Sequence, residues 1–416
     1  MRVNNLLGDR EHRRGLVAPP VLLVLLKLAL KYSGDSLLPH VKPGDVVLAM
    51  LVVAQHIGSH LGGDGIATVI DDAPGPLGRD LIANQLFHGS YSAAHVMGRF
   101  VRRWHELPVE MAGQRDVCDL PGTYEDATGV PLADLTLVGT GLWASAHQGR
   151  WVVPPEYFTT TDLTPEHLER VLALIATDVP RLRADVRAET SPTEWSFEMF
   201  RRSPVVRLAD GRLLVLDQEL LIDRVFGWWP MLDIKKPPNG RPADKARSDA
   251  AEGCLRHLTE VAVTEVLSAI AGTGTARRMY GDAELRAAFP GQGQKITDAA
   301  IDYGDAWVLV EVTAVRLRQN SVNAASEQAQ IDDMDKLVKK ARQIDATIRA
   351  LKNRENRLTG VKPAHRKTFY PVLVMAEGFP ANPVTLTVLR ERVRRPAFSP
   401  ARESRRWKSS TRKRSR

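Results

Sequence analysis

The chain has 416 residues, of which 44% are hydrophobic and 25% are charged. This length corresponds to roughly two to three domains, and the composition excludes a single small module, a disordered chain and a fibrous protein. The formal net charge is +8, but residues 396–416 carry eight basic side chains and one acidic one, so the rest of the chain is nearly neutral.

The basic C-terminal segment, residues 396–416, is typical either of an arm that contacts polyanions or of a solvated, disordered end. Its arginines and lysines alternate with serines and Trp407, a mixture suited to phosphate contacts that lack sequence preference and depend strongly on salt. We expect DNA as a partner and a disordered tail. The candidate nucleic-acid-binding residues are Arg402, Arg405, Arg406, Lys408, Arg412, Lys413 and Arg414.

Cysteine usage and hydropathy indicate a cytoplasmic protein. Cys118 and Cys254 are far apart in the sequence, with neither metal-type spacing nor a disulfide framework, which fits a reducing compartment. The most apolar N-terminal run, residues 21–30, is interrupted by Lys27 and is much shorter than the roughly 18–20 residues that span a bilayer. We therefore expect no membrane association.

The N-terminal part is predicted to be rich in helices. Residues 1–115 contain apolar helical stretches at 21–32 and 46–56, and a further helical pattern at 81–105. No spacing in this part indicates a particular chemistry.

Residues 116–234 predict a mixed α+β region. A Thr-Pro-Glu sequence at residues 164–166 is a helix start, and the helix is expected to continue over 168–188 with one interruption at Pro180. Two short β-type runs around an Asp-Gly pair predict a hairpin near residues 204–216.

A stretch rich in lysine, proline and glycine predicts a linker over residues 235–244, because prolines exclude a helix interior there. The domain that follows, residues 245–395, begins with a long helix over residues 244–270. This helix carries three glutamates that could reach the strands after it, namely Glu252, Glu260 and Glu265.

The most informative segment is a predicted hairpin within residues 295–314. Its two strands meet at a Gly-Asp pair, residues 304–305, where glycine accepts the positive φ of a two-residue loop. This loop fixes the register of the two strands. The register places Asp298 directly opposite Glu311.

The two faces of this hairpin differ in polarity because side chains alternate along a strand. One face carries Ala299 and Ile301 together with Val308, Val310 and Val312; the other carries Asp298, Glu311 and Thr313. Opposed like charges destabilise a cross-strand pair by up to about 1 kcal/mol, so a cation is expected between the carboxylates. A divalent metal such as Mg²⁺ is one candidate. An arginine bridge or a solvent-exposed acidic face are the alternatives.

An amphipathic helix and a strand follow the hairpin. Apolar side chains at 4-3-4-3 spacing over residues 337–351 predict the helix, and Lys336, Lys340 and Gln343 form one polar ridge beside its buried face. The apolar run at residues 369–376 is suited to a buried strand.

This order of elements resembles the PD-(D/E)xK nuclease superfamily, which has the restriction-endonuclease-like fold. The resemblance covers about residues 245–395 and implies an α/β domain with a mixed sheet flanked by helices, preceded by an α-rich α+β region. Asp298 matches the family's first metal-binding aspartate, and Glu311 matches the acidic residue of the (D/E)-x-K triplet. Thr313 departs from the family, because a lysine normally stands there.

The remaining site residues follow from the same resemblance. Glu252 is our first match for the helical glutamate and Glu260 the second, and Gln343 matches the glutamine often found on the helix after the hairpin. A hydroxyl cannot act as the cation that offsets charge on the phosphate, so Lys336 or Lys340 is expected to replace the missing lysine.

The implied activity is Mg²⁺-dependent hydrolysis of phosphodiester bonds in DNA, with Mn²⁺ as an alternative metal and with defence or repair as typical settings. The implied metal ligands are Glu252, Asp298, Glu311 and the carbonyl of Val312. If no amine reaches the site, the domain is instead a catalytically degenerate nuclease fold that binds nucleic acid or a partner. Many nucleases of this fold act as dimers, so a homodimer is a further expectation.

Overall fold

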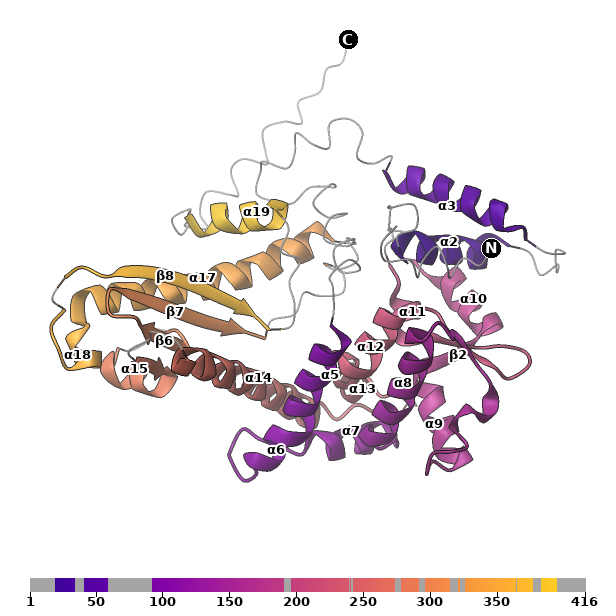
Figure 1. The fold of residues 1–416 in the computed structure, drawn as a ribbon, viewed down its shortest axis with the longest axis horizontal. Helices are drawn as coiled ribbons and strands as arrows, with labels where there is room; N and C mark the ends of the chain where they lie inside the picture. The colour runs from indigo at the N-terminus through magenta and orange to yellow at the C-terminus, as the bar shows by residue number, and fades with distance from the viewer. Residues whose placement is uncertain are drawn as a thin grey trace, which may run out of the picture.

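The computed structural model describes residues 19–33, 41–58, 92–190, 196–238, 240, 242–273, 278–291, 296–314, 321, 326–363, 365–376 and 383–394. The basic segment predicted to contact nucleic acid, residues 396–416, lies outside these residues. The described elements form an N-terminal body, which precedes residue 239, and a C-terminal body, which begins at residue 278. The long helix α14 (Lys245–Thr273) runs between the two bodies (Figure 1).

The first two helices of the described residues form where the sequence predicts them and pack against each other. They are α2 (Pro19–Tyr32) and α3 (Pro43–Gly58). Leu23 and Val24 of α2 and Val53 of α3 are buried in one small core. Within the described part of the chain, no helix is both long enough and apolar enough to cross a membrane.

Residues 92–147 fold into a cluster of short helices. The helix predicted over residues 81–105 is described only from residue 92 onward, and residues 81–91 lie outside the described residues. Helices over residues 120–128 and 132–147 were not predicted from the sequence. Phe100, Trp104 and Tyr124 are buried at its centre, where the rings of Phe100 and Trp104 stack with centroids 5.3 Å apart. The helices are α5 (Ala93–Val101), the π-helical turn η3 (Arg102–Glu106), α6 (Leu107–Glu110), α7 (Leu120–Thr128) and α8 (Leu132–His147).

A four-stranded mixed sheet completes the N-terminal body. Its strand order is β1-β4-β3-β2, with β2 parallel to β3 and the other pairs antiparallel. The predicted hairpin is confirmed as the β3–β4 pair, and Gly211 takes φ +82° in its turn. The strands are β1 (Val152–Val153), β2 (Ala176–Asp178), β3 (Val205–Arg207) and β4 (Leu213–Val215).

The long helix predicted over residues 168–188 is wrong in one respect, because strand β2 divides it. Helix α9 (Pro165–Ile175) starts at the predicted Thr164 cap and ends at β2. Asp178 then caps a new helix, α10 (Val179–Ala188), by accepting the Arg181 backbone N–H at 2.7 Å. Proline at the second position of α10 suits a helix start rather than an interior.

Four further helical segments close the N-terminal body. They pack Phe158, Phe200, Phe226 and Met231 into its cores. These segments are the 3-10 turn η4 (Pro155–Phe158), α11 (Glu198–Arg202), α12 (Gln218–Phe226) and α13 (Trp229–Lys235).

The C-terminal body is built on a second mixed sheet of order β5-β6-β7-β8. Strands β5, β6 and β7 are antiparallel, and β8 runs parallel to β7. The predicted hairpin register is confirmed, because Ala299 pairs with Val310 and Gly304 takes φ +91° in the loop. The strands are β5 (Arg278–Gly281), β6 (Ala299–Asp302), β7 (Ala306–Thr313) and β8 (Thr368–Met375).

Different helices cover the two faces of this sheet. Trp307 and Leu309 of β7 share a core with Ile344 and Leu351 of α17 (Glu327–Arg354). The opposite face, with the three predicted valines of β7, packs against Val263 and Leu267 of α14. Among the described residues, this body also contains the helices α15 (Asp282–Ala288), α18 (Asn356–Thr359) and α19 (Pro383–Arg394).

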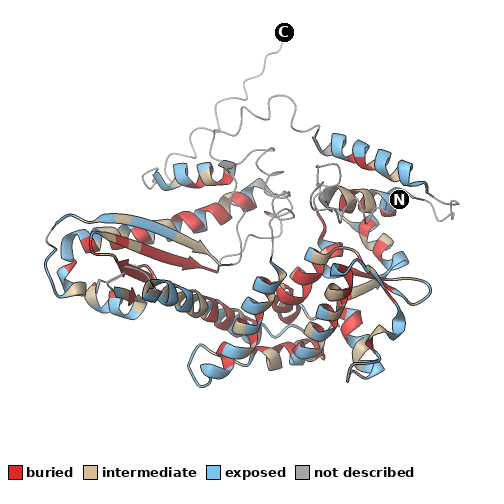
Figure 2. Ribbon diagram, in the orientation of Figure 1, coloured by how far each residue is buried: buried red, intermediate tan, exposed pale blue. Residues whose placement is uncertain are grey.

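Strand β8 is an edge strand, and the expectation of a buried position for it is wrong. Tyr370 is 54% exposed and Val372 is 38% exposed, as the pale colour of this strand shows (Figure 2). An apolar run alone cannot distinguish a central strand from an edge strand. Pro371 fits an edge because it has no N–H to contribute to a ladder.

Helix α14 belongs to the cores of both bodies. Its N-terminal half packs Ala251, Leu255 and Leu258 into the large core of the N-terminal body. Its C-terminal half packs Val263 and Leu267 against the sheet of the C-terminal body. Residues near the middle of α14 therefore lie between two packed cores.

Candidate functional site

The two predicted carboxylates meet at the end of the β6–β7 hairpin. Asp298 immediately precedes β6, and its Oδ2 accepts the backbone N–H of Val312 at 2.7 Å. Glu311 lies next to Val312 on β7 and is fully buried. The predicted pairing of the hairpin therefore brings both acidic groups to one place.

The acidic face of the hairpin is buried beneath α17. Glu311 and the neighbouring Thr313 are 0% and 1% exposed, respectively. This excludes the alternative of a solvent-exposed acidic face. It also means that a counter-charge must come from the helix.

Lys340 of α17 supplies that charge. Its Nζ lies 2.6 Å from Glu311 Oε1, and its side chain remains 28% exposed. Lys336, one turn earlier, instead contacts Asp333 at 3.0 Å. Gln343 is partly exposed, and its backbone carbonyl accepts the Thr347 hydroxyl at 3.2 Å. Of the two predicted lysines, only Lys340 therefore reaches the carboxylate pair.

The glutamate of α14 that shares the electrostatic environment of this pair is Glu260, not Glu252. Burial and the charge of Asp298 raise the pKa of Glu260, whereas Lys340 opposes this shift. Glu252 lies two turns earlier and forms ion pairs with Lys235 and Arg256 of the same region.

Glu265, the third candidate on α14, is also outside the site. Its Oε1 lies 2.7 Å from the guanidinium of Arg102, which also contacts Glu106 and Glu110. The apolar stripe of α14 indicates which face meets the sheet. It does not indicate which turn of α14 lies next to the carboxylates of the hairpin.

The electrostatics of the site favour the binding of a cation. Burial raises the pKa of Glu311 to about 7, with the Lys340 hydrogen bond opposing the shift and the charge of Asp298 adding to it. Burial also raises the pKa of Asp298, against the stabilising Val312 N–H. Three carboxylates therefore share one desolvated region with one ammonium group, an arrangement that favours additional positive charge.

The donor atoms fit a Mg²⁺ ion held by few protein ligands. Glu311 Oε2 is buried and has no hydrogen-bond partner among the described residues. The carbonyl of Val312 points to the same side as its N–H in an extended strand, which is the side of Asp298. No group of three His, Cys, Asp or Glu side chains in the described part of the chain is placed to hold a metal. Mg²⁺ accepts one or two carboxylates with a carbonyl and waters, so two acidic ligands suffice.

Two further side chains near the site were not anticipated from the sequence. Arg286 of α15 lowers the pKa of Asp298, lies 2.6 Å from Asp282 and has a side chain that is 70% exposed. His257 lies one turn before Glu260 on α14 and lowers the pKa of that carboxyl. The helix that carries Arg286 has no periodic signal of its own, because it is only two turns long.

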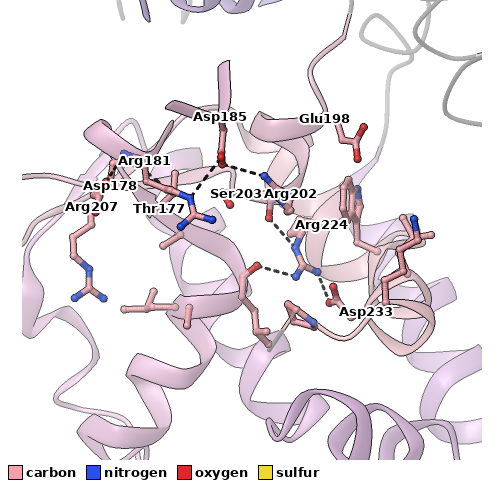
Figure 3. Close-up of a pocket in the computed structure, with 18 of the residues that line it drawn as sticks. Thr177, Asp178, Arg181, Asp185, Glu198, Arg202, Ser203, Arg207, Arg224 and Asp233 are labelled. Atoms are coloured by element: carbon pink, nitrogen blue, oxygen red, sulfur yellow. Dashed lines mark hydrogen bonds and ion pairs between the residues drawn. The ribbon is translucent and has the colours of Figure 1, made fainter. Parts of the chain in front are cut away.

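A cavity of about 870 Å³, lined by both apolar and charged side chains, lies elsewhere, in the N-terminal body (Figure 3). Its charged side chains largely neutralise one another: Asp185 contacts Arg181 and Arg202, and Asp233 contacts Arg224 at 2.8 Å. It shares no lining residue with the carboxylate pair. We therefore assign the candidate site to the hairpin and α17.

No protein-family model, curated protein or solved structure matches this chain. The function must therefore be inferred from the chain's own residues.

Proposed function

We propose that the chain is a Mg²⁺-dependent nuclease of the PD-(D/E)xK type that hydrolyses phosphodiester bonds in DNA, with Mn²⁺ as an alternative metal. The observation that carries the proposal is the contact between Lys340 and Glu311 at 2.6 Å, opposite Asp298. Lys340 supplies the amine that Thr313 cannot supply. It comes from α17 instead of β7, but it lies beside the same carboxylate. The mixed sheet flanked by helices supports the restriction-endonuclease-like fold.

Each residue of the site has a distinct role in this proposal. Asp298, Glu311 and the Val312 carbonyl would hold Mg²⁺, which when bound lowers the pKa of a water molecule and polarises the phosphate. Lys340 orients the attacking water and offsets the charge that develops on the phosphate. Arg286, whose side chain is 70% exposed, would contact a phosphate of the bound strand.

A catalytically degenerate fold that binds DNA or a partner is the second candidate. It is favoured by the complete burial of Glu311 and by its direct neutralisation by Lys340. In that case Lys340 would serve only to stabilise a buried carboxylate. Cleavage assays separate the two candidates.

The test is cleavage of plasmid and of single-stranded DNA by purified protein with Mg²⁺ or Mn²⁺, beside an EDTA blank. Glu311→Gln keeps the shape of the side chain but removes its charge, so cleavage is expected to fall at least about 100-fold. Lys340→Met is expected to cause a similar loss. Lys339→Met removes the same charge from the adjacent, exposed position of α17 and is the matched control.

The outcomes are distinct. Metal-dependent cleavage that is lost in Glu311→Gln and Lys340→Met but kept in Lys339→Met supports the nuclease. DNA binding without cleavage by the unmodified protein supports the degenerate fold. Equal cleavage by the protein and its Glu311→Gln variant places the activity elsewhere and overturns the assignment of this site.

A further inference from the structure

The fold brings the two cysteines of the chain into contact, although 136 positions separate them. The backbone N–H of Cys118 donates to Cys254 Sγ at 3.3 Å, and the Cys254 thiol lies 3.8 Å from the Cys118 carbonyl. Both contacts are with the Cys254 sulfur, which therefore lies against the backbone of Cys118. The sequence spacing gives no sign of a disulfide framework, and the tertiary structure creates the pair.

The two cysteines differ in their exposure to solvent. Cys118 lies just before α7 and is partly exposed, whereas Cys254 lies on α14 and is only 2% exposed. A small oxidant can therefore reach the pair from the Cys118 side. The packing of Cys254 with Leu255 and Leu258 in the large core keeps its sulfur in place.

The local hydrogen bonds favour a thiolate at one of the two sulfurs. The Cys118 thiol and backbone N–H lower the pKa of Cys254 to about 7, although burial opposes this shift. The neighbouring Cys254 sulfur and burial raise the pKa of Cys118, with a smaller contribution from Asp119 and with Arg247 opposing the shift, so the proton of the pair stays on Cys118. A thiolate beside a protonated thiol is the reactive arrangement for oxidation to a disulfide.

We propose that Cys118 and Cys254 form a dithiol oxidation site that hydrogen peroxide converts into an intramolecular disulfide. The Cys254 thiolate attacks one peroxide oxygen, the O–O bond breaks, and a sulfenic acid and hydroxide form. The hydroxide takes the Cys118 proton and becomes water. The Cys118 thiolate then attacks the Cys254 sulfur and displaces the hydroxyl group as hydroxide. This hydroxide takes a proton from solvent and becomes water. That proton balances the one that Cys254 released to solvent when its thiolate formed. In total, two thiols and one peroxide give one disulfide and two waters.

The disulfide would join the segment before α7 to the first half of α14. It would close a loop of more than one hundred residues, which removes many conformations from the unfolded chain. Because the two residues already touch, the bridge needs little rearrangement. It would hold α14 in the N-terminal body, two turns before Glu260.

The experiment treats the full-length protein with hydrogen peroxide and maps the product by mass spectrometry without reduction. We expect the loss of two hydrogens per chain, one bridged Cys118–Cys254 peptide, and a rise in Tm of about 5 °C or more. Dithiothreitol should reverse all three changes. Cys118→Ser and Cys254→Ser should each show none of them.

Two results would overturn the proposal. One is the absence of the bridged peptide although the protein consumes peroxide, for example by sulfinic acid formation at Cys118 alone. The other is a disulfide between two copies of the chain, seen as a dimer on a non-reducing gel. Because Cys254 is buried, the partly exposed Cys118→Ser variant keeps the test valid if Cys254→Ser does not fold.

Discussion

Lys340 and Lys367 of the C-terminal body are both held against buried carboxylates, but their surroundings differ. Lys367 lies between Asp302 at 2.8 Å and Glu355 at 2.7 Å, with its Nζ 4.8 Å from the ring centroid of Trp307. Lys340 instead contacts a carboxylate whose second oxygen has no hydrogen-bond partner among the described residues. The Lys367 cluster is therefore suited to stabilising the fold, and the Lys340 cluster to binding a cation.

Lys367 should make stability depend on pH in the alkaline range. Burial alone would lower the pKa of Lys367, but its hydrogen bonds to Asp302 and Glu355 outweigh this and raise it above 10.5. A raised lysine pKa gives stability that is fully present below the unfolded value and is lost as pH rises through the folded value. Lys367→Met, which leaves two buried carboxylates without a cation, should lower the free energy of unfolding at neutral pH by about 3–5 kcal/mol.

Urea unfolding at neutral pH and above pH 10.5 measures both effects. The difference between the protein and Lys367→Met should shrink only in the alkaline range. Lys339→Met, a change at an exposed position of α17, is the control and should alter stability by about 0.5 kcal/mol or less. A Lys367→Met variant as stable as this control would show that the buried cluster contributes nothing.

At the scale of elements, local chemistry predicted more than periodicity did. The β6–β7 hairpin and its register followed from one Gly-Asp pair, because a two-residue loop leaves no freedom in the pairing. Strand β2 was missed because it has three residues, and its pairing with β3 rather than its own pattern defines it. Edge strand β8 was taken for a buried one because both are apolar runs.

The residues of the candidate site also fall into two groups, those that local sequence predicts and those that it does not. Asp298 and Glu311 could be placed from the hairpin alone, since cross-strand neighbours follow from register. The choice between Lys336 and Lys340, and between Glu252 and Glu260, depends on the position of each helix along its own axis relative to the sheet. This position is set by side-chain packing between the helix and the sheet, which a single sequence does not reveal.

Glu260 and Glu252 make a direct comparison possible on one helix. If Glu260 belongs to the site, Glu260→Gln should reduce metal-dependent cleavage by about 10-fold to 100-fold, while Glu252→Gln should leave it unchanged. Glu252→Gln breaks contacts with Lys235 and Arg256, which should cost about 1 kcal/mol or less in stability. Initial cleavage rates and urea unfolding of both variants provide the measurements. Equal activity losses in the two variants would contradict the placement of Glu260.

At the scale of the molecule, α14 couples the two bodies. Cys254 and Leu258 lie in the N-terminal core, Glu260 is close enough to Asp298 and Lys340 for their charges to shift its pKa, and Leu267 packs on the C-terminal sheet. A change in the N-terminal body that moves α14 along its axis would therefore move Glu260 relative to Asp298. The N-terminal body is thus a structural support for the site as well as a separate folded part.

The uneven charge of the whole chain makes a prediction about DNA affinity. Residues 396–416 carry a net charge of +7, whereas the rest of the chain is nearly neutral. Each phosphate neutralised on double-stranded DNA contributes about 0.9 to the slope of log K against log salt concentration. If the tail makes most of the phosphate contacts, its removal should reduce this slope by up to about 6.

The measurement uses the Glu311→Gln variant, with and without residues 396–416, in EDTA so that DNA is bound but not cut. Fluorescence anisotropy with one DNA duplex at several salt concentrations gives both slopes. A large decrease in the truncated protein assigns the electrostatic contacts to the tail and leaves the folded body to position the strand at Glu311 and Lys340. Unchanged slopes would instead assign them to basic groups of the folded body such as Arg286, whose side chain is 70% exposed.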